Sequence, residues 1–234
     1  MKTSNPGIQS VACGDSTATD DRGNLRRETH HQVSQEIRRE MRLEMRKRRR
    51  ALPASTRAAA ARSLASILSR KRILRPGAHI AVYLAHGAEI DLAQVITRAR
   101  RAGCRLYLPA IVSIEKGSMQ FVRFDAGQPL RRNRFGIYEP ELRTSPRIAV
   151  RRLDAVLLPL VAVDVRGWRL GSGAGFYDRR LNHLRSGRRW RRPKLIGIAY
   201  DFQRVPILSP QPWDVPLDAV VTERAFYPSH RPFA

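Results

Sequence analysis

Short apolar runs alternate with helical segments in the middle of the sequence, and this alternation restricts the possible fold more than any other feature. The runs at 79–85 and 104–109 have the length of buried strands. Between them, Asp91 can cap a helix that Gly103 ends by taking a left-handed conformation. A strand, a helix and a second strand in this order form a βαβ unit with parallel strands. We therefore expect an α/β protein with a mainly parallel open sheet flanked by helices.

Further apolar runs predict the remaining strands, at 119–124, 153–164, 194–200 and 218–222. Before the sheet, apolar residues recur at every fourth position from Val33 to Met45 on a basic helix, and Ser55 is predicted to cap a second helix. Residues 1–32 mix polar types without such a period. We expect them to form a disordered extension, followed by a single domain over 33–234.

The chain carries a formal net charge of +24, which raises the question of a nucleic-acid partner. Only five of its 44 basic residues are lysines, and arginine, alanine and proline are frequent along the whole sequence. A genome-wide codon preference explains this pattern as well as a binding face does. We therefore expect a solvated, arginine-rich surface that attracts anionic small molecules, and no nucleic-acid partner.

Cysteine usage and hydropathy restrict the cellular compartments and the kinds of metal or disulfide site that the protein is expected to have. Cys13 and Cys104 are far apart and belong to no cysteine–histidine cluster, which argues against a disulfide framework and against a zinc site. No apolar stretch approaches the roughly 18 residues of a membrane span. Acidic residues near the N-terminus do not suit a transit peptide. We expect a monomer in the reducing cytoplasm, without a membrane partner.

The longest apolar run is followed by a glycine-rich turn in the segment RLGSGAGFYDRRL, residues 169–181. Gly171, Gly173 and Gly175 alternate, so the backbone can take unusual conformations and a ligand can approach it closely. Successive N–H groups followed by a helix start form an anion site at the strand ends. The spacing is neither a dinucleotide fingerprint nor a Walker A loop. A tight structural turn is the alternative interpretation.

Two charged residues beside this turn favour a phosphate site. Arg169 can contact a phosphate, and Asp178 lies one turn into the following helix, where a carboxylate can hold a magnesium ion that bridges phosphates. The alternative for Asp178 is a carboxylate that the dipole of the helix favours near its start.

The segment LLPLVAVDVRGWRLGSGAGFYDRRL resembles the signature of the 5-formyltetrahydrofolate cyclo-ligase family. The segments VYLAHGAEIDL, RLYLP, NRFGIYEP and WDVPLDAVVT match that family in the same order, so the resemblance covers about 37–222. It implies a NagB/RpiA/CoA-transferase-like three-layer fold. It also implies an enzyme that uses ATP and Mg²⁺ to convert 5-formyltetrahydrofolate, with or without a polyglutamate tail, into 5,10-methenyltetrahydrofolate, ADP and phosphate.

The resemblance also implies which residues act. Arg169 and Asp178 would be catalytic, and Asp178 and Asp214 would bind Mg²⁺. The implied ATP-binding residues are Arg38, Arg42, Arg169, Leu170, Gly171, Ser172, Gly173, Ala174, Gly175, Phe176 and Tyr177. The implied folate-binding residues are Leu84, Glu89, Ser172, Gly173, Ala174, Gly175 and Phe176.

Three positions depart from the family pattern. Arg38 stands where lysine is common, Ser172 where a bulkier residue is common, and Ala174 where glycine or lysine is usual.

Other residues keep alternatives of their own. Glu89 could be a surface charge, Asp214 could fix a turn, and Phe176 and Tyr177 could belong to the core. Two alternative functions stay open as well. One is a non-catalytic relative that binds RNA or nucleotide through its basic surface, and the other is a kinase for a different substrate.

Overall fold

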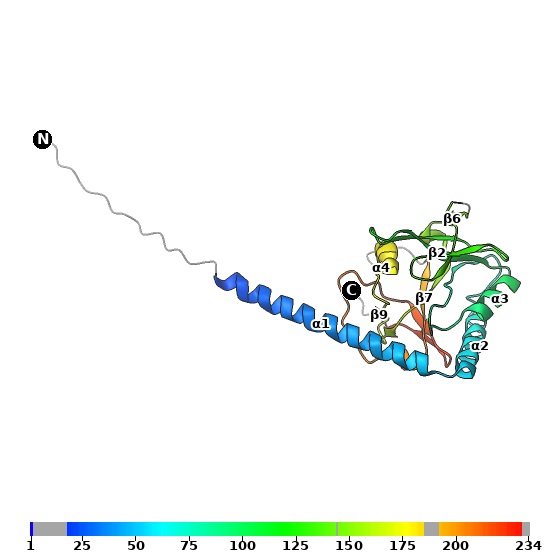
Figure 1. Ribbon diagram of the computed structural model, residues 1–234, viewed down its shortest axis with the longest axis horizontal. Coiled ribbons are helices and arrows are strands. Elements are labelled where there is room, and N and C mark those ends of the chain that lie inside the picture. The colour runs from blue at the N-terminus through cyan, green and yellow to red at the C-terminus, as the bar shows by residue number, and fades with distance from the viewer. Residues whose placement is uncertain (2–17, 144, 185–191, 231–234) are drawn as a thin grey trace. The chain divides into compact units, whose positions relative to one another are not determined.

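The computed structural model describes Met1 and residues 18–143, 145–184 and 192–230 (Figure 1). The chain divides into two compact units, Met1–Arg39 and Glu40–Ala234. Helix α1 (Ala18–Ala51) contributes residues to both units and begins before the position that the apolar pattern predicts. The interpretation of 1–32 as a disordered extension stays a prediction. All other elements belong to the second unit, and no helix in the described part of the chain is long and apolar enough to span a membrane.

Two helices flank the first strand of the sheet in sequence. Helix α2 (Ala54–Arg70) begins directly after Pro53, and no side chain caps it, so the predicted cap at Ser55 is wrong. Proline already has the φ angle that a helix entry needs, and the chain therefore enters α2 two residues earlier. Helix α3 (Ala93–Arg101) begins where the Asp91 carboxylate accepts a hydrogen bond from the Ala93 N–H at 2.9 Å. Gly103, at φ +75°, follows its end as predicted.

The main sheet has eight strands in the order β12-β11-β10-β7-β1-β2-β3-β6. Its five central neighbours, from β11 to β2, are parallel, whereas β12, β3 and β6 are antiparallel to their partners. The predicted mainly parallel α/β sheet is therefore confirmed. The strands are β1 (His79–Ala81), β2 (Arg105–Ser113), β3 (Ser118–Arg123), β6 (Arg147–Ile148), β7 (Ala155–Pro159), β10 (Lys194–Ile198), β11 (Ala219–Val221) and β12 (Phe226–Pro228).

Two small antiparallel pairs accompany the main sheet. They are β4 (Leu130–Arg132) with β5 (Tyr138–Pro140), and β8 (Ala162–Val163) with β9 (Arg169–Leu170). The predicted apolar run at 153–164 therefore divides into β7 and β8 instead of forming one strand. The remaining short helices are η1 (Val150–Arg152), α4 (Phe176–Leu181), η2 (Asn182–Leu184) and η3 (Asp201–Gln203).

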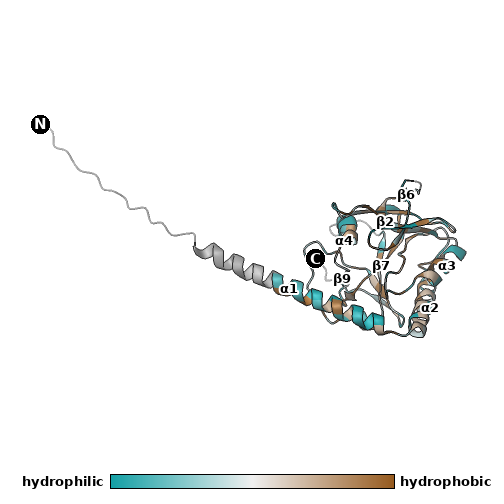
Figure 2. Cartoon of the chain, in the orientation of Figure 1, coloured by the Kyte–Doolittle hydropathy of each residue, from teal (hydrophilic) through white to brown (hydrophobic). Residues whose placement is uncertain are grey.

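Alternation along the central strands builds a three-layer structure. On one face, Ile80 and Leu157 pack in a core with α2 and α3. On the other face, Val156 and Leu158 pack with Leu181 of α4. The central strands carry brown apolar segments in Figure 2, whereas the coloured turns of α1 are mostly teal. Helices thus cover both faces of the sheet, as the predicted fold class requires.

The order of the strands fixes where a ligand site belongs. From β1 the chain moves to β2 on one side, whereas from β7 it moves through β10 to β11 on the other side. The direction of winding therefore reverses between β1 and β7. In open α/β sheets, ligands bind beyond the carboxyl ends of the strands at such a reversal.

Candidate active site

Two connections carry predicted site residues to the carboxyl ends of β1 and β7. Residues 82–90 follow β1 and contain Leu84 and Glu89. The glycine-rich loop follows β7 only after the β8–β9 hairpin, which a hydrogen bond of 2.7 Å from the Val161 N–H to the Leu170 carbonyl closes. The predicted loop at the strand ends is therefore displaced from the main sheet by one small hairpin.

The loop exposes its backbone. Ser172, Gly173 and Ala174 are exposed, and Gly173 and Gly175 have φ angles of +116° and +67°. A Cβ atom at Gly171 would meet no atom within 4 Å, so there is space beside the backbone. Within the described residues, the N–H groups of Ser172 and Gly173 donate to no other protein group. Because α4 has only six residues, these N–H groups matter more for an anion than the dipole of that helix.

Two arginines of α1 hold the first carbonyls of the loop. The Arg42 Nε donates to the Gly171 carbonyl at 2.9 Å, and the Arg46 Nη2 donates to the Ser172 carbonyl at 3.0 Å. The structure thus brings the predicted residue Arg42 to the loop. Arg38 belongs to the first unit, and its contact with the nucleotide stays a prediction. Sequence reasoning missed Arg46, although its spacing of four from Arg42 puts both on one helix face.

Arg179 of α4 holds the end of the loop. Its Nη2 donates to the Ala174 carbonyl, and its Nε donates to the Gly117 carbonyl at 3.0 Å. Its guanidinium carbon lies 5.6 Å from the centre of the Phe176 ring. Arg179 therefore links the loop to the turn between β2 and β3, a role that sequence reasoning also missed.

Arg169 and Asp178 form an ion pair beside the loop. The Arg169 Nη2 lies 2.6 Å from the Asp178 Oδ1, and the Arg169 side chain is only 3% exposed. Its Nη1 donates to the Val215 carbonyl at 2.6 Å, and the Val215 N–H lies 3.3 Å from the same Asp178 oxygen. This geometry favours a role in orienting the Asp178 carboxylate. A direct contact of Arg169 with phosphate stays a prediction.

Asp214 lies next to Val215 and is buried. Its Oδ2 accepts a hydrogen bond from the Gln211 N–H at 2.9 Å, and its own N–H donates to the Gln211 carbonyl at 3.0 Å. Asp214 thus fixes a turn, as the alternative interpretation held. The next residue, Val215, donates its N–H to the Asp178 carboxylate, so the backbone at this turn lies beside Asp178.

The donor set in this neighbourhood suits Mg²⁺. No group of three or more His, Cys, Asp or Glu side chains suited to a metal occurs in the described part of the chain. A site built from Asp178 and Asp214 would therefore need further oxygen ligands. Mg²⁺ is commonly bound through one or two carboxylates together with substrate phosphates and water, which fits such a pair.

Glu89 is half-buried and accepts a hydrogen bond from the backbone, which argues against a simple surface charge. Burial raises the pKa of its carboxyl group, opposed by a hydrogen bond of 3.1 Å from the His86 N–H and by the charge of Arg49. Burial also raises the pKa values of Tyr83 and Tyr177, and in each case the Glu89 charge is the next cause. Tyr83 belongs to the connection after β1 and Tyr177 follows the glycine-rich loop. The Glu89 charge therefore contributes to the raised pKa of one tyrosine in each of the two segments.

A buried arginine lies near this carboxylate. Burial lowers the pKa of the Arg49 guanidinium, and the Glu89 charge partly restores it. The Arg49 Nη1 donates to the Leu160 carbonyl at 3.4 Å, whereas the Arg49 Nε and the Tyr200 hydroxyl are buried and unpaired within the described residues. Buried polar atoms are normally satisfied by protein, water or a ligand. Leu160 directly follows β7 and Tyr200 lies two residues after β10, so these polar groups lie at the carboxyl ends of two parallel strands.

Comparison with known proteins decides the family. The sequence model of the 5-formyltetrahydrofolate cyclo-ligase family matches residues 34–223. The chain belongs to the 5-formyltetrahydrofolate cyclo-ligase family. It is 39% identical over 145 residues to the 5-formyltetrahydrofolate cyclo-ligase of Escherichia coli K12, a match that covers 61% of this chain and 76% of the relative.

Solved structures carry the same fold. The 5,10-methenyltetrahydrofolate synthetase of Aquifex aeolicus superposes with a TM-score of 0.69 at 25% identity, covering 85% of this chain and 95% of that one. The synthetase of Mycoplasma pneumoniae superposes with a TM-score of 0.62 at 24% identity, covering 80% of this chain and 98% of that one. All the residues that the sequence predicted for the site lie within the part that matches the cyclo-ligase family.

Of the remaining predicted residues of this cyclo-ligase family member, Leu84, Phe176 and Tyr177 are partly buried, whereas Leu170 is fully buried in a core cluster. Leu84 packs against the core on the α2–α3 face, and Phe176 and Tyr177 pack against the core on the α4 face. Phe135, which sequence reasoning did not select as a site residue, meets Phe176 edge-to-face with ring centres 6.2 Å apart and is 41% exposed. The NRFGIYEP segment therefore reaches the start of α4.

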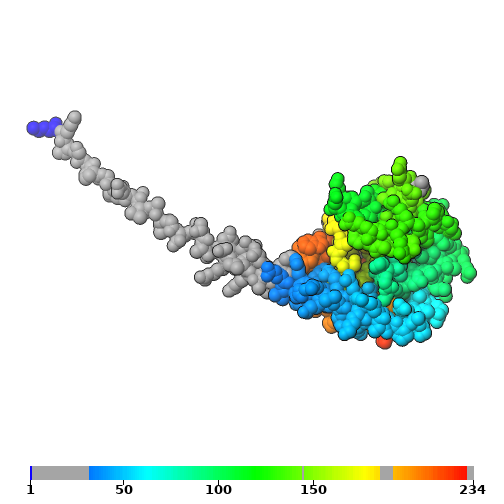
Figure 3. Space-filling view, viewed as in Figure 1, coloured from blue at the N-terminus to red at the C-terminus, as the bar shows by residue number. Residues whose placement is uncertain are grey.

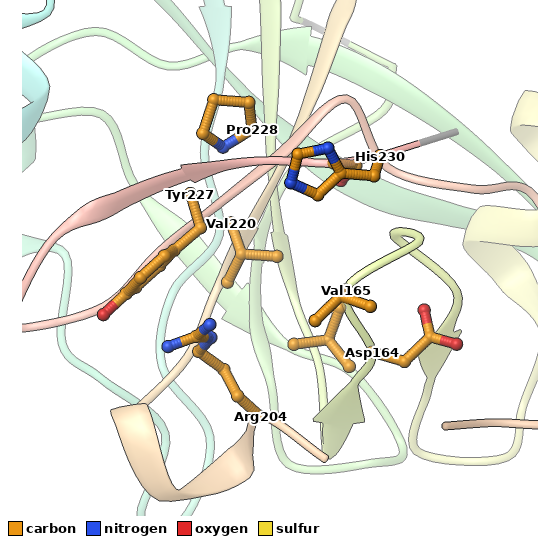
Figure 4. Close-up of a pocket in the computed structure, with 9 residues that line it drawn as sticks. Asp164, Val165, Arg204, Val220, Tyr227, Pro228 and His230 are labelled. Atoms are coloured by element: carbon orange, nitrogen blue, oxygen red, sulfur yellow. The ribbon is translucent and has the colours of Figure 1, made fainter. Parts of the chain in front are cut away.

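A cavity of about 120 Å³ lies apart from these residues, between β8, β11 and β12 (Figure 4). Polar groups that line it already make contacts within the protein. The Asp164 carboxylate accepts hydrogen bonds from Arg166 and from the Leu208 N–H, and the Arg204 guanidinium stacks 3.5 Å from the centre of the Tyr227 ring. We therefore assign the cavity no part in the site.

Proposed function

We propose that this chain catalyses the ATP- and Mg²⁺-dependent cyclisation of 5-formyltetrahydrofolate to 5,10-methenyltetrahydrofolate, with release of ADP and phosphate. One observation carries the proposal most directly. An exposed glycine-rich loop is followed by the Asp178 carboxylate, which a buried arginine orients, and Glu89 lies in the connection after β1, on the other side of the reversal point of the sheet. Membership of the cyclo-ligase family supports the choice of a folate substrate.

The chemistry requires activation of a poor leaving group. The formyl group on N5 is amide-like, so its oxygen does not leave unaided. Transfer of the γ-phosphoryl group of ATP to that oxygen breaks the bond to ADP and makes the oxygen part of a good leaving group. N10 then attacks the formyl carbon and gives up its proton, the ring closes, and the oxygen departs as part of inorganic phosphate.

The residues around the loop would position the phosphates. In the proposal, the N–H groups of Ser172 and Gly173 donate to phosphate oxygens, together with the predicted contacts of Arg38 and Arg42. Asp178 and Asp214 would hold Mg²⁺, which neutralises charge on the phosphates when bound. Arg169 would keep the Asp178 carboxylate in its binding orientation.

The folate would lie toward Glu89. A half-buried carboxylate is suited to accept hydrogen bonds from the N–H groups of a pteridine ring, since few water molecules compete for it. Leu84 and Phe176 would supply apolar contacts. We also propose that the enzyme acts as a monomer in the cytoplasm, where ATP and reduced folates are available.

A direct assay tests the proposal. Purified protein with ATP, Mg²⁺ and 5-formyltetrahydrofolate is expected to form the methenyl chromophore, with one ADP per product. Asp178→Asn should lower kcat by at least about 100-fold while the protein stays folded, since a bound metal contributes several kcal/mol to the transition state. Absence of ATP-dependent product from folded wild-type protein would contradict the proposal. Near-normal turnover of Asp178→Asn would remove Asp178 from the metal site.

A further inference from the structure

Three carbonyl groups of the glycine-rich loop accept hydrogen bonds from arginines outside the loop. Two of these arginines come from α1 and one comes from α4, so the loop is held from both ends. The pairs are Arg42 with the Gly171 carbonyl, Arg46 with the Ser172 carbonyl, and Arg179 with the Ala174 carbonyl.

This arrangement determines which way the loop presents its N–H groups. In a trans peptide unit the C=O and the following N–H point in opposite directions. With an arginine on each of these three carbonyls, the N–H groups of the residues that follow them, Ser172, Gly173 and Gly175, face away from the arginines. Glycines tolerate inverted peptide orientations, and Gly173 already has a φ of +116°. Without the arginines, the loop could turn carbonyl oxygens toward an anion and repel it.

We propose that Arg46 and Arg179 are positioning residues that keep the N–H groups of this loop turned toward the phosphates of ATP. The inference rests on the proposed function, because it takes the loop to be the phosphate site. Neither arginine needs to touch the nucleotide, since each acts through a backbone carbonyl of the loop.

The turn between β2 and β3 is shaped to receive Arg179. Gly117 has a φ of +56°, and a Cβ atom there would lie 2.1 Å from the Arg179 Nε. The Gly117 carbonyl accepts the hydrogen bond from that same nitrogen. In Figure 3 the yellow surface of α4 lies against the green surface that includes this part of the chain. Only glycine leaves room for the guanidinium between the turn and the loop.

Gly117→Ala therefore tests the role of Arg179 without changing Arg179 itself. The new methyl group should displace the guanidinium and raise the KM for ATP about tenfold, which corresponds to the loss of about 1.4 kcal/mol of binding. The Kd for ADP with Mg²⁺ should rise in parallel. Gly127→Ala is the matched control, because Gly127 also has a positive φ, +71°, but a Cβ atom there would meet no atom within 4 Å. It carries the same backbone strain without touching an arginine.

The pair of positions also allows a coupling measurement. Arg179→Ala should raise the KM for ATP as Gly117→Ala does. The double variant should be no worse than either single variant, since both remove the same contact. A purely structural role would instead give additive losses of thermal stability with an unchanged KM for ATP.

The role of Arg46 is tested with one substitution that removes its charge and one that keeps the charge but changes the hydrogen-bond geometry. Arg46→Ala should raise the KM for ATP about threefold, a smaller effect because Arg46 holds the loop through an exposed contact, whereas Arg179 is also anchored by a part-buried hydrogen bond to the Gly117 carbonyl. Arg46→Lys should restore part of the loss, since an ammonium can still donate one hydrogen bond. Arg50→Ala makes the same change of charge on α1. Its Nε donates to the Arg46 carbonyl of its own helix and, among the described residues, to no loop carbonyl, so this change should leave the KM for ATP unchanged.

The outcomes separate this inference from the proposed function. If the wild-type protein turns over 5-formyltetrahydrofolate with ATP, but Gly117→Ala and Arg46→Ala behave like their controls, the positioning role is overturned and the proposed function stands. If the folded wild-type protein shows neither turnover nor ADP binding, the proposed function fails, and the inference fails with it.

Discussion

The contacts of Arg169 in the structure suggest a different role from the one that its position in the sequence predicts. In the sequence it is an arginine beside a glycine-rich turn, and a phosphate contact is the natural expectation. In the structure its guanidinium is almost fully buried and spans the Asp178 carboxylate and the Val215 carbonyl. A charge held in this way is costly to leave unpaired, so its partner depends on it.

Arg169→Ala is therefore expected to destabilise the protein by about 3 kcal/mol, because it leaves the Asp178 carboxylate without its buried counter-ion. Urea unfolding followed by circular dichroism measures the change. Arg39→Ala is the control, since the Arg39–Glu36 pair is 70% and 56% exposed, and its loss should cost less than about 1 kcal/mol. Equal effects of the two substitutions would show that the buried pair does not hold Asp178 in place.

Glu89 makes the stability depend on pH in a defined direction. Burial raises the pKa of Glu89 above its ordinary value of 4.5, although His86, Arg49 and Arg46 partly oppose this. The folded state then holds the proton more tightly than the unfolded state, so stability is lost as the pH rises through the raised pKa. Glu89→Gln should therefore be more stable than the wild type near about pH 7, and this gain should vanish below about pH 4.

Thermal unfolding at the two pH values measures this gain. Turnover should fall in the same variant, since a neutral amide replaces the carboxylate that is proposed to hold the folate, and the KM for folate should rise about tenfold. A stability difference that stays the same at both pH values would contradict the assignment of a raised pKa to Glu89.

At the scale of elements, the glycine-rich loop is a segment in which a substitution can change ligand binding without changing the stability of the fold. Gly171 has no positive φ, and a Cβ atom there would meet no atom within 4 Å. Gly171→Ala should therefore change the free energy of unfolding by less than about 0.5 kcal/mol. If phosphates approach this backbone, the methyl group will meet them instead, and the KM for ATP should rise about tenfold or more. An unchanged KM together with unchanged stability would mean that no ligand approaches Gly171.

Local signals predicted the elements that depend on local physics. The apolar runs and Gly103 were enough to predict the β1–α3–β2 unit, because strand burial and helix termination are encoded within a few residues. The β8–β9 hairpin was not predicted, since its two-residue strands depend on pairing across the intervening loop. Within the site, Gly171, Asp178 and Glu89 could be proposed from motif and family resemblance. The contacts of Arg46 with Ser172 and of Arg179 with Gly117 were not predicted, because they join residues 126 and 62 positions apart, although the spacing of Arg46 from Arg42 puts both on one helix face.

At the scale of the whole molecule, the formal charge of +24 should act on the encounter with anionic substrates. Salt screens such attraction over a distance of about 10 Å at 0.1 M. We expect the KM for ATP to rise several-fold between about 0.02 M and about 0.3 M KCl, with a much smaller change in kcat. A kcat that falls with salt while KM stays constant would indicate that the charge serves the folded structure and not substrate capture.

The fate of one oxygen atom tests the central claim most directly. 5-Formyltetrahydrofolate labelled with ¹⁸O in its formyl group is incubated with the protein, ATP and Mg²⁺, and the released phosphate is examined by mass spectrometry. If the loop and Asp178 direct phosphoryl transfer to the formyl oxygen, each phosphate will carry that labelled oxygen. Label that appears in water, with unlabelled phosphate, would contradict the account.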